Sequence, residues 1–198
     1  MSEWWTYGPS DFLMFSPEAY WRLVERYNAA WWPAQLVALA SAGLVIALLR
    51  HKAGWAQRTV LLLLALAWAW TGWAFHFHSH AEISLAAPWL AAASGVQAVL
   101  LASASLMNVR PSRPASRTAT AMAQVLLAAS LLFPLAAPLQ GQAWARAEVF
   151  AFMPDPTALA TLGALMVLEH PGRGWRCALA VLPVWSLLLG AATRWLLA

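Results

Sequence analysis

Short polar segments divide this chain into long apolar runs. A helix that crosses the hydrocarbon core of a bilayer needs about 20 mostly apolar residues. Five runs reach this length: residues 29–49, 59–77, 86–107, 118–139 and 177–197. The first four carry no charged side chain, and the fifth carries only Arg194 near its end. This pattern predicts a bundle of membrane-spanning helices.

A sixth apolar segment, residues 150–169, is interrupted by Pro154-Asp155-Pro156. Proline removes a backbone donor and clashes with the preceding turn, so a continuous helix through this triplet is not expected. We expect a helix to begin here instead, with Asp155 as the N-cap and Pro156 as its first residue. The fifth span is therefore predicted to be broken, with an acidic side chain at or near membrane depth.

The N-terminal segment, residues 1–28, has a different pattern. Ser16-Pro17 is typical of a helix start, and apolar side chains then recur at helical spacing at Tyr20, Leu23, Val24 and Tyr27. Charged residues occupy the other side. This pattern predicts an amphipathic helix that lies on the membrane surface and leads into the first span.

Composition agrees with this assignment of one all-α membrane domain over residues 1–198. Of the residues, 62% are hydrophobic and only 10% are charged, whereas a soluble domain averages roughly 25% charged residues. The net charge of +4 comes from basic residues in short clusters between apolar runs, so we expect a lipid bilayer and not nucleic acid as the partner. The single cysteine, Cys177, excludes an intramolecular disulfide framework. The start of the chain lacks the pattern of a cleaved signal peptide.

The basic residues also predict an orientation. Eight lie in the first, third and fifth loops, and four lie in the N-terminal segment, the other loops and the C-terminal end. Because basic loops stay in the cytoplasm, both termini are expected outside, which is the periplasm for a protein of the bacterial inner membrane. Seven of the eight acids and eleven of the fourteen tryptophans then fall on the outer side. The tryptophans form either an interfacial belt or the lining of a pocket.

The stretch from Phe75 to Glu82 contains three histidines and a carboxylate. Imidazole and carboxylate groups are ligands of zinc, copper and iron, and His76 and His80 share a helix face at a spacing of four. A metal site of His76, His80 and Glu82 is therefore one interpretation, and histidines solvated at the membrane interface are the other. No motif in the chain requires a cofactor.

Further candidates for ligand binding share the predicted outer side. Asp155 and Thr157 begin the broken span, where a helix N-terminus or a carboxylate can face a ligand. The complete candidate set is His76, Asp155, Thr157, Glu18, Tyr20, Arg22, Asn28, Gln35 and Trp73. The alternative is that the surface helix has a solvated polar face and that Asp155 only caps a helix.

Several segments resemble an uncharacterised family of bacterial six-helix membrane proteins, a domain of unknown function. The matching segments are Ser10-Asp11-Phe12-Leu13, Phe15-Ser16-Pro17 with Tyr20, Tyr27-Asn28-Ala29, Trp32-Pro33-Ala34-Gln35, Trp73-Ala74-Phe75-His76, Ala86-Ala87-Pro88-Trp89, and Pro154-Asp155-Pro156-Thr157-Ala158 through Thr161-Leu162-Gly163. The resemblance covers most of the chain and implies the topology and the site location, with no activity attached. The family pattern lacks His78 and His80, which favours His76 alone over a three-histidine metal site.

The sequence thus favours a membrane protein that binds or transports a small molecule or ion through an outward-facing pocket. The pocket would be formed by the N-terminal helix, the end of the second span and the broken fifth segment. One alternative is a membrane-embedded enzyme that uses His76 and Asp155, with or without the assistance of a metal. The other is a non-catalytic subunit or anchor of a larger complex, and the length of the chain is compatible with a homo-oligomer.

Overall fold

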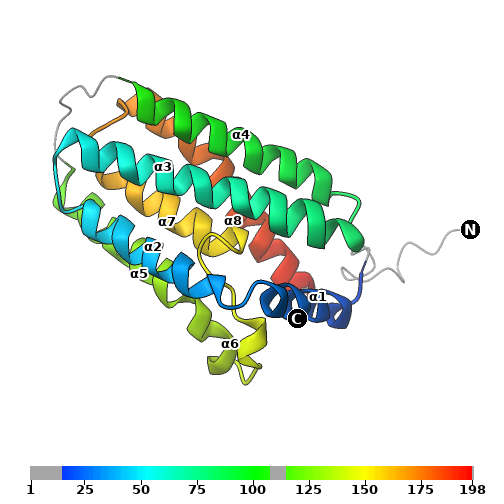
Figure 1. Cartoon of the computed structure of the whole chain (residues 1–198). Coiled ribbons are helices and arrows are strands. Elements are labelled where there is room, and N and C mark those ends of the chain that lie inside the picture. Colours follow the sequence, from blue (N-terminus) through cyan, green and yellow to red (C-terminus); the bar gives the residue numbers. More distant parts are fainter. Residues whose placement is uncertain (1–14, 108–114, 198) are drawn as a thin grey trace, which may run out of the picture.

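Helices account for most of the structure, a computed structural model that describes residues 15–107 and 115–197. Those residues form no β-strand. Four helical segments are long and apolar enough to cross a membrane: Gly54–Glu82, Ala87–Leu106, Arg117–Leu139 and Arg173–Leu196. They run roughly alongside one another as a bundle (Figure 1). The all-α fold class predicted from the sequence is confirmed.

The first predicted span is divided in the structure. Helix α1, Pro17–Ala30, and helix α2, Ala34–Leu48, meet at 87° across Trp31–Pro33. Pro33 has no backbone N–H to continue the helix, so the predicted span from residue 29 is wrong at its start. The two helices together satisfy the criterion for one further span, which makes at most five by length and composition among the described residues.

Helix α1 forms as the sequence predicts. The Ser16 hydroxyl accepts a hydrogen bond from the backbone N–H of Ala19 at 3.2 Å, which caps the helix start. Leu23, Val24 and Tyr27 are buried along one side. The helix lies across one end of the bundle, close to the C-terminal part of α8 (Figure 1), and we call this the α1 end. The earlier part of the N-terminal segment, residues 1–14, lies outside the described residues.

The second predicted span, residues 59–77, is longer than expected in both directions. Helix α3, Gly54–Trp70, continues as a π-helix, η3, over Thr71–Ser79, and then as a short 3-10 turn, η4, over His80–Glu82. The histidine stretch beyond residue 77 is therefore helical as well, and Phe75 and His76 are buried inside the bundle.

The predicted broken fifth span corresponds to helix α7, Pro154–Val167. Its N-cap residue is Met153, and Asp155 lies within the first turn and makes no capping hydrogen bond, so the prediction of Asp155 as N-cap is wrong. The carboxylate binds Arg194 instead. At 14 residues α7 is about 21 Å long, shorter than a hydrocarbon core of about 30 Å. A count of six spans is therefore not supported by length and composition alone.

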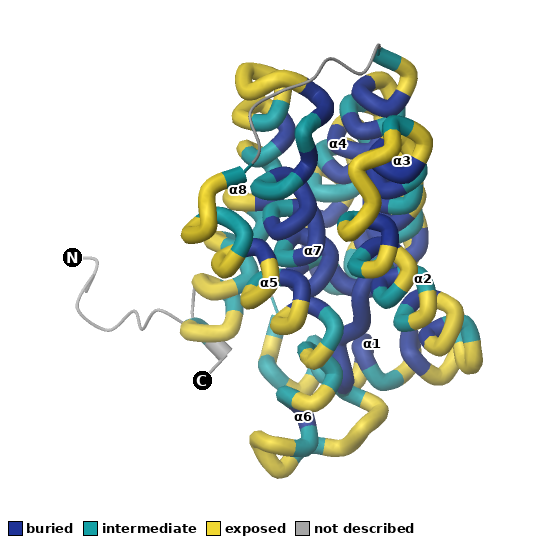
Figure 2. The backbone as a smooth tube through the Cα atoms, turned by 90° about the vertical axis from the view of Figure 1, so that its left-hand side faces the viewer, coloured by how far each residue is buried: buried dark blue, intermediate teal, exposed yellow. Residues whose placement is uncertain are grey.

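Helix α7 occupies the centre of the bundle, and Figure 2 shows it as the most continuously buried helix. It packs against α5, Arg117–Leu132, and against α8, Arg173–Leu197. On the α5 side, a Cβ added at Gly163 would lie 2.9 Å from the Leu127 Cγ and 3.1 Å from the Ala123 carbonyl oxygen. Glycine at this position therefore permits the close approach of two helices.

The remaining elements complete the two sides of the bundle. Helix α4, Ala87–Leu106, packs along α3 and η3, within one residue of the predicted third span at each end. After α5 the chain forms η5, Phe133–Leu135, α6, Ala136–Leu139, and η6, Trp144–Arg146. A loop from η6 to α7 then returns the chain to the α1 end, where Val149, Phe152 and Met153 pack with α1 in a second apolar cluster.

Candidate functional site

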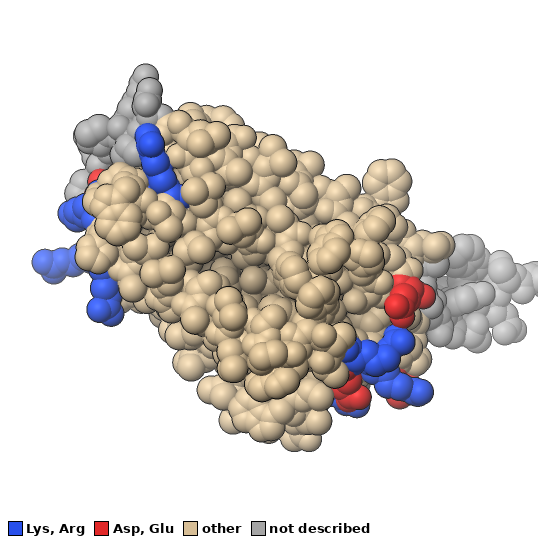
Figure 3. All heavy atoms as spheres, in the orientation of Figure 1, with Lys and Arg blue, Asp and Glu red and all other residues tan. Residues whose placement is uncertain are grey.

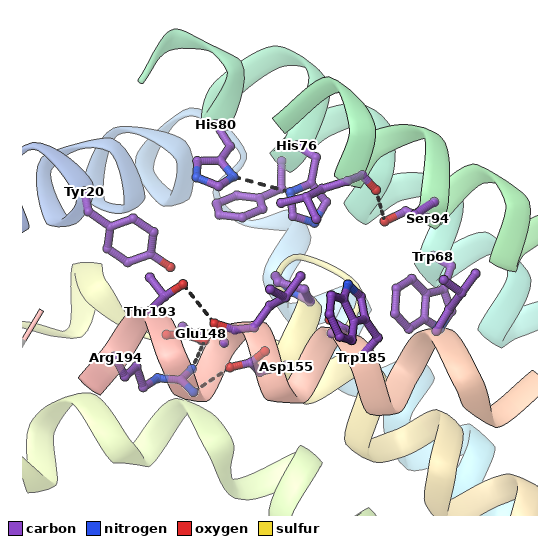
Figure 4. A pocket seen from close by; sticks show the side chains of 18 residues that line it. Tyr20, Trp68, His76, His80, Ser94, Glu148, Asp155, Trp185, Thr193 and Arg194 are labelled. Carbon is purple, nitrogen blue, oxygen red and sulfur yellow. Dashed lines mark hydrogen bonds and ion pairs between the residues drawn. The ribbon is translucent and has the colours of Figure 1, made fainter. Parts of the chain in front are cut away.

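A cavity of about 90 Å³ opens at the α1 end, between α1, η3, α4, α8 and the start of α7. The polar side chains that line it come from these separate elements and point toward one another (Figure 4). They include Tyr20, His76, His80, Glu148, Asp155 and Arg194. The volume has room for several water molecules or a small organic molecule.

Arg194 forms the charged side of the cavity with two carboxylates. Its Nη2 donates to Glu148 Oε2 at 2.7 Å, and its Nη1 lies 2.5 Å from Asp155 Oδ2. The Glu148 and Asp155 side chains are 9% and 4% exposed, so both carboxylates are removed from solvent. The Arg194 guanidinium also lies over the Phe133 ring, 5.2 Å from its centroid. One cation therefore compensates two buried acids.

The buried surroundings affect both carboxylates. Burial raises the pKa of Glu148 above its ordinary value, because the charged form loses its hydration, and the guanidinium of Arg194 opposes that shift. Asp155 Oδ1 is buried and has no hydrogen-bond partner. Helix α8 approaches this carboxylate so closely at Gly190 that an added Cβ would collide with both oxygens. The carboxylate is thereby confined between α7 and α8.

A histidine pair forms the opposite side of the cavity. His76 and His80 come from η3 and η4, and their Nδ1 atoms lie 3.5 Å apart. His80 also stacks on Phe75, with ring centroids 5.5 Å apart. π-Helical turns are rare and occur often at functional sites. Here the π-helix carries the inward-facing His76.

Aromatic rings provide much of the remaining lining. Trp68 Nε1 donates to Thr161 Oγ1 at 2.9 Å, so its only donor is engaged within the bundle. Trp185, on α8, lines the same cavity and is 56% exposed. Tyr20 directs its hydroxyl toward the cavity from α1 (Figure 4).

The structure brings together three of the nine residues predicted to bind a ligand: His76, Asp155 and Tyr20. Glu18 and Arg22 are exposed on α1 and do not line this cavity. A hydrogen bond to the backbone and another to Ser16 lower the pKa of Glu18, as expected for an acid in the first turn of a helix.

Four more predicted residues lie away from the cavity: Thr157, Asn28, Gln35 and Trp73. Thr157 accepts from the Ala151 N–H at 2.9 Å and donates to the Met153 carbonyl at 2.7 Å. The hydroxyl of Thr157 is therefore used by the backbone around the start of α7. Trp73 is 49% exposed and packs against other aromatic rings of the α1 end.

The two amide side chains of this group also bind backbone carbonyls. Asn28 donates to the carbonyls of Ala145 and Ala147, at 2.8 and 2.9 Å respectively. Gln35 donates to the Asn28 carbonyl at 2.8 Å. Both residues therefore fix the turn between α1 and α2 and its contact with η6.

The predicted metal set is not assembled. Glu82 pairs with Arg26 at 2.8 Å on the surface, and its side chain is 54% exposed, whereas His76 and His80 face the interior. Within residues 15–107 and 115–197, no group of three His, Cys, Asp or Glu side chains is positioned to hold a metal ion. The histidines therefore remain a pair.

Sequence reasoning missed Glu148 and Arg194 as members of the site. A signal for Arg194 is present, because it is the only charged residue in its apolar run and a charge within a span needs a partner. Its partners lie 46 and 39 positions earlier in the chain, so no local spacing connects them. Only the packing of the η6–α7 loop against α8 reveals the cluster.

A second cavity, of about 380 Å³, also borders the ion pair. Glu148 and Arg194 line both cavities, and Trp21, Phe133 and Arg146 line only the second. Arg146 is held by Glu25 at 2.6 Å and lies over the Trp21 ring. The Glu148–Arg194 pair thus lines two cavities at the α1 end.

Fold and site together define a class: an all-α bundle of long apolar helices with a buried charged pocket at one end. Residues 17–197 match the family of unknown function DUF6064, and the chain belongs to that family. The resemblance to an uncharacterised domain family is thereby confirmed. Comparison with curated proteins and with solved structures yields no match.

Proposed function

We propose that this protein is an integral membrane protein that binds a small polar molecule or ion in the cavity at the α1 end and transports it. The observation that carries this proposal is the burial of two carboxylates and one guanidinium beside a cavity. Ionisable groups are expensive within an apolar bundle and are retained mainly where they serve a ligand or an ion. Asp155 Oδ1, buried and without a partner, is the atom that a ligand would satisfy.

The second cavity supports transport over simple binding. A solute that moved between the two spaces would pass the Glu148–Arg194 pair, which lines both. An anchor subunit would need no such arrangement, because lipid and partner contacts require only the apolar exterior. The pair is therefore the contact that we expect to open during transport.

Retention of a native ligand tests the binding function. The protein is purified in mild detergent, and the small molecules released on denaturation are identified by mass spectrometry. We expect a compound near one equivalent that is lost from Asp155→Asn and kept in Glu18→Gln, which alters an exposed acid outside the cavity. Equal retention by both variants, or no retained compound from any of the three proteins, would count against the proposed site.

We infer further that the chain forms six spans in the bacterial inner membrane with both termini outside. Figure 3 shows mostly blue basic side chains at one end of the molecule and red beside blue at the other. The first of these, which we call the basic end, carries Arg50 and Lys52, between α2 and α3, and Arg173, at the start of α8. Basic residues are retained in the cytoplasm, which places the α1 end and its cavity outside.

The single cysteine provides a test of this orientation. Cys177 is exposed near the start of α8, at the basic end. A membrane-impermeant maleimide applied to intact spheroplasts should leave Cys177 unmodified and should react with Ala81→Cys in a Cys177→Ala background, because Ala81 is exposed at the α1 end. Lysis should make Cys177 reactive. Modification of Cys177 before lysis would reverse the proposed orientation.

A further inference from the structure

We propose that the ligand of this site is a small organic cation that carries N–H donors, such as a primary ammonium ion. This inference rests on the proposed binding function and specifies the chemistry of the ligand. It follows from the charge of the cavity, from its free acceptor atoms and from its aromatic walls.

The charge of the lining favours a cation. Two carboxylates, Glu148 and Asp155, face one guanidinium, Arg194, and the other titratable side chains of the lining are His76, His80 and Tyr20. With these three neutral and both carboxylates ionised, the cavity carries one uncompensated negative charge. An anionic ligand would add a second negative charge to this enclosed space, whereas a cation neutralises it.

The free atoms of the lining favour a ligand that donates hydrogen bonds. Asp155 Oδ1 and His80 Nε2 are both buried without a partner. An ionised carboxylate oxygen only accepts. A neutral pair of imidazoles that shares one proton between its Nδ1 atoms leaves one Nε2 as an acceptor and the other as a donor. In the tautomer in which His80 carries the shared proton on Nδ1, the free His80 Nε2 is the acceptor. Carboxylate and imidazole then offer two acceptors, which an ammonium group with three N–H donors can satisfy.

The walls fit a cation with a small apolar part. The Trp68 indole N–H is engaged by Thr161, so Trp68 presents its ring to the cavity and not a donor. Trp185, Phe75 and Tyr20 add further rings. Ring faces attract ammonium groups. In the described part of the chain no three metal-binding side chains converge, which favours an organic cation over a coordinated metal ion. The 90 Å³ of space fits a ligand of a few heavy atoms.

A series of four probes of similar size tests this proposal on the purified full-length protein in detergent. The probes are ethylammonium, acetate, ethanol and tetramethylammonium, compared at constant ionic strength by titration calorimetry and by tryptophan fluorescence. A ligand of three heavy atoms at the upper limit of about 1.5 kcal/mol per atom reaches a Kd on the order of 1 mM. We expect ethylammonium to bind in this range and the other three to bind at least about tenfold more weakly.

Variants then locate the binding. Asp155→Asn should weaken ethylammonium binding by about tenfold or more, and Glu18→Gln, the matched acid outside the cavity, should leave the Kd unchanged. Binding of acetate in preference to ethylammonium would overturn the cation and leave the proposed binding function standing. Absence of binding by every probe, or tetramethylammonium equal to ethylammonium, would also overturn the inference. The probe series uses the unmodified protein, so its outcome does not depend on whether a variant folds.

Discussion

The two ends of the bundle each bury an ionisable side chain, His170 at the basic end and Asp155 at the α1 end. His170 is 2% exposed, its Nε2 lies 2.8 Å from the Ala104 carbonyl oxygen, and its backbone N–H donates to Gln57 Oε1 at 2.8 Å. These contacts tie the end of α7 to α3 and α4. Asp155 is similarly buried, but one of its oxygens has no partner and faces a cavity.

The difference separates two uses of a buried polar group. A group whose hydrogen bonds are made by the protein stabilises the fold, because breaking any of them leaves a partner unsatisfied. A group that keeps an unsatisfied atom beside a cavity has a free-energy cost in the empty state, and that cost is recovered when a ligand binds. Substitutions at the two ends should therefore act on different quantities.

The largest expected effect follows from Arg194→Leu. Removing the guanidinium leaves Glu148 and Asp155 as buried charges without compensation, which should lower the free energy of unfolding by about 3–5 kcal/mol. The measurement is unfolding in mixed micelles. Arg22→Leu is the control, because this arginine is exposed, and it should change stability by less than about 0.5 kcal/mol.

A compensating variant sharpens this prediction. Glu148→Gln and Asp155→Asn, added to Arg194→Leu, remove the uncompensated charges and should restore most of the lost stability. If Arg194→Leu were no more destabilising than Arg22→Leu, the three side chains would not form a coupled cluster.

A smaller effect is expected from Gly190→Ala. The added methyl group would collide with the Asp155 carboxylate, so helix α8 or the side chain must shift, at about 1–3 kcal/mol. Ethylammonium binding should weaken as well. Gly43→Ala is the matched control, because no atom lies within 4 Å of its added Cβ; in a helix this change should be neutral or stabilising by up to about 1 kcal/mol. Equal behaviour of the two variants would show that Asp155 is free to move.

Much of this fold can be predicted from apolar run lengths, because lipid requires long apolar helices. The third span is predicted within one residue at each end, and the cap at Ser16 and the buried side of α1 follow from local side-chain chemistry. The errors fall where tertiary contacts override local rules. The continuation of α3 through the histidines depends on burial against α4 and α1. The apolar periodicity of one segment does not indicate such contacts with other helices.

The site is only partly predictable for a related reason. His76, Asp155 and Tyr20 are expected on one side of the membrane, and the structure brings them to one cavity. Asn28, Gln35 and Thr157 come from the same predicted side, but they bind backbone groups. Polar residue type and position cannot distinguish these outcomes, because the distinction depends on whether a backbone partner lies within reach after folding.

The smallest expected effect, His170→Phe, tests the comparison most directly. The substitution removes the contact to the Ala104 carbonyl at the end of α4, and stability should fall by about 1 kcal/mol. The Kd for ethylammonium should not change, because His170 lies at the opposite end from the cavity. Asp155→Asn should show the reverse, with binding weakened by about tenfold and a smaller loss of stability than Arg194→Leu. Weakened ethylammonium binding in His170→Phe would mean that the two ends are coupled, since a local hydrogen bond at the basic end would then influence a site at the α1 end.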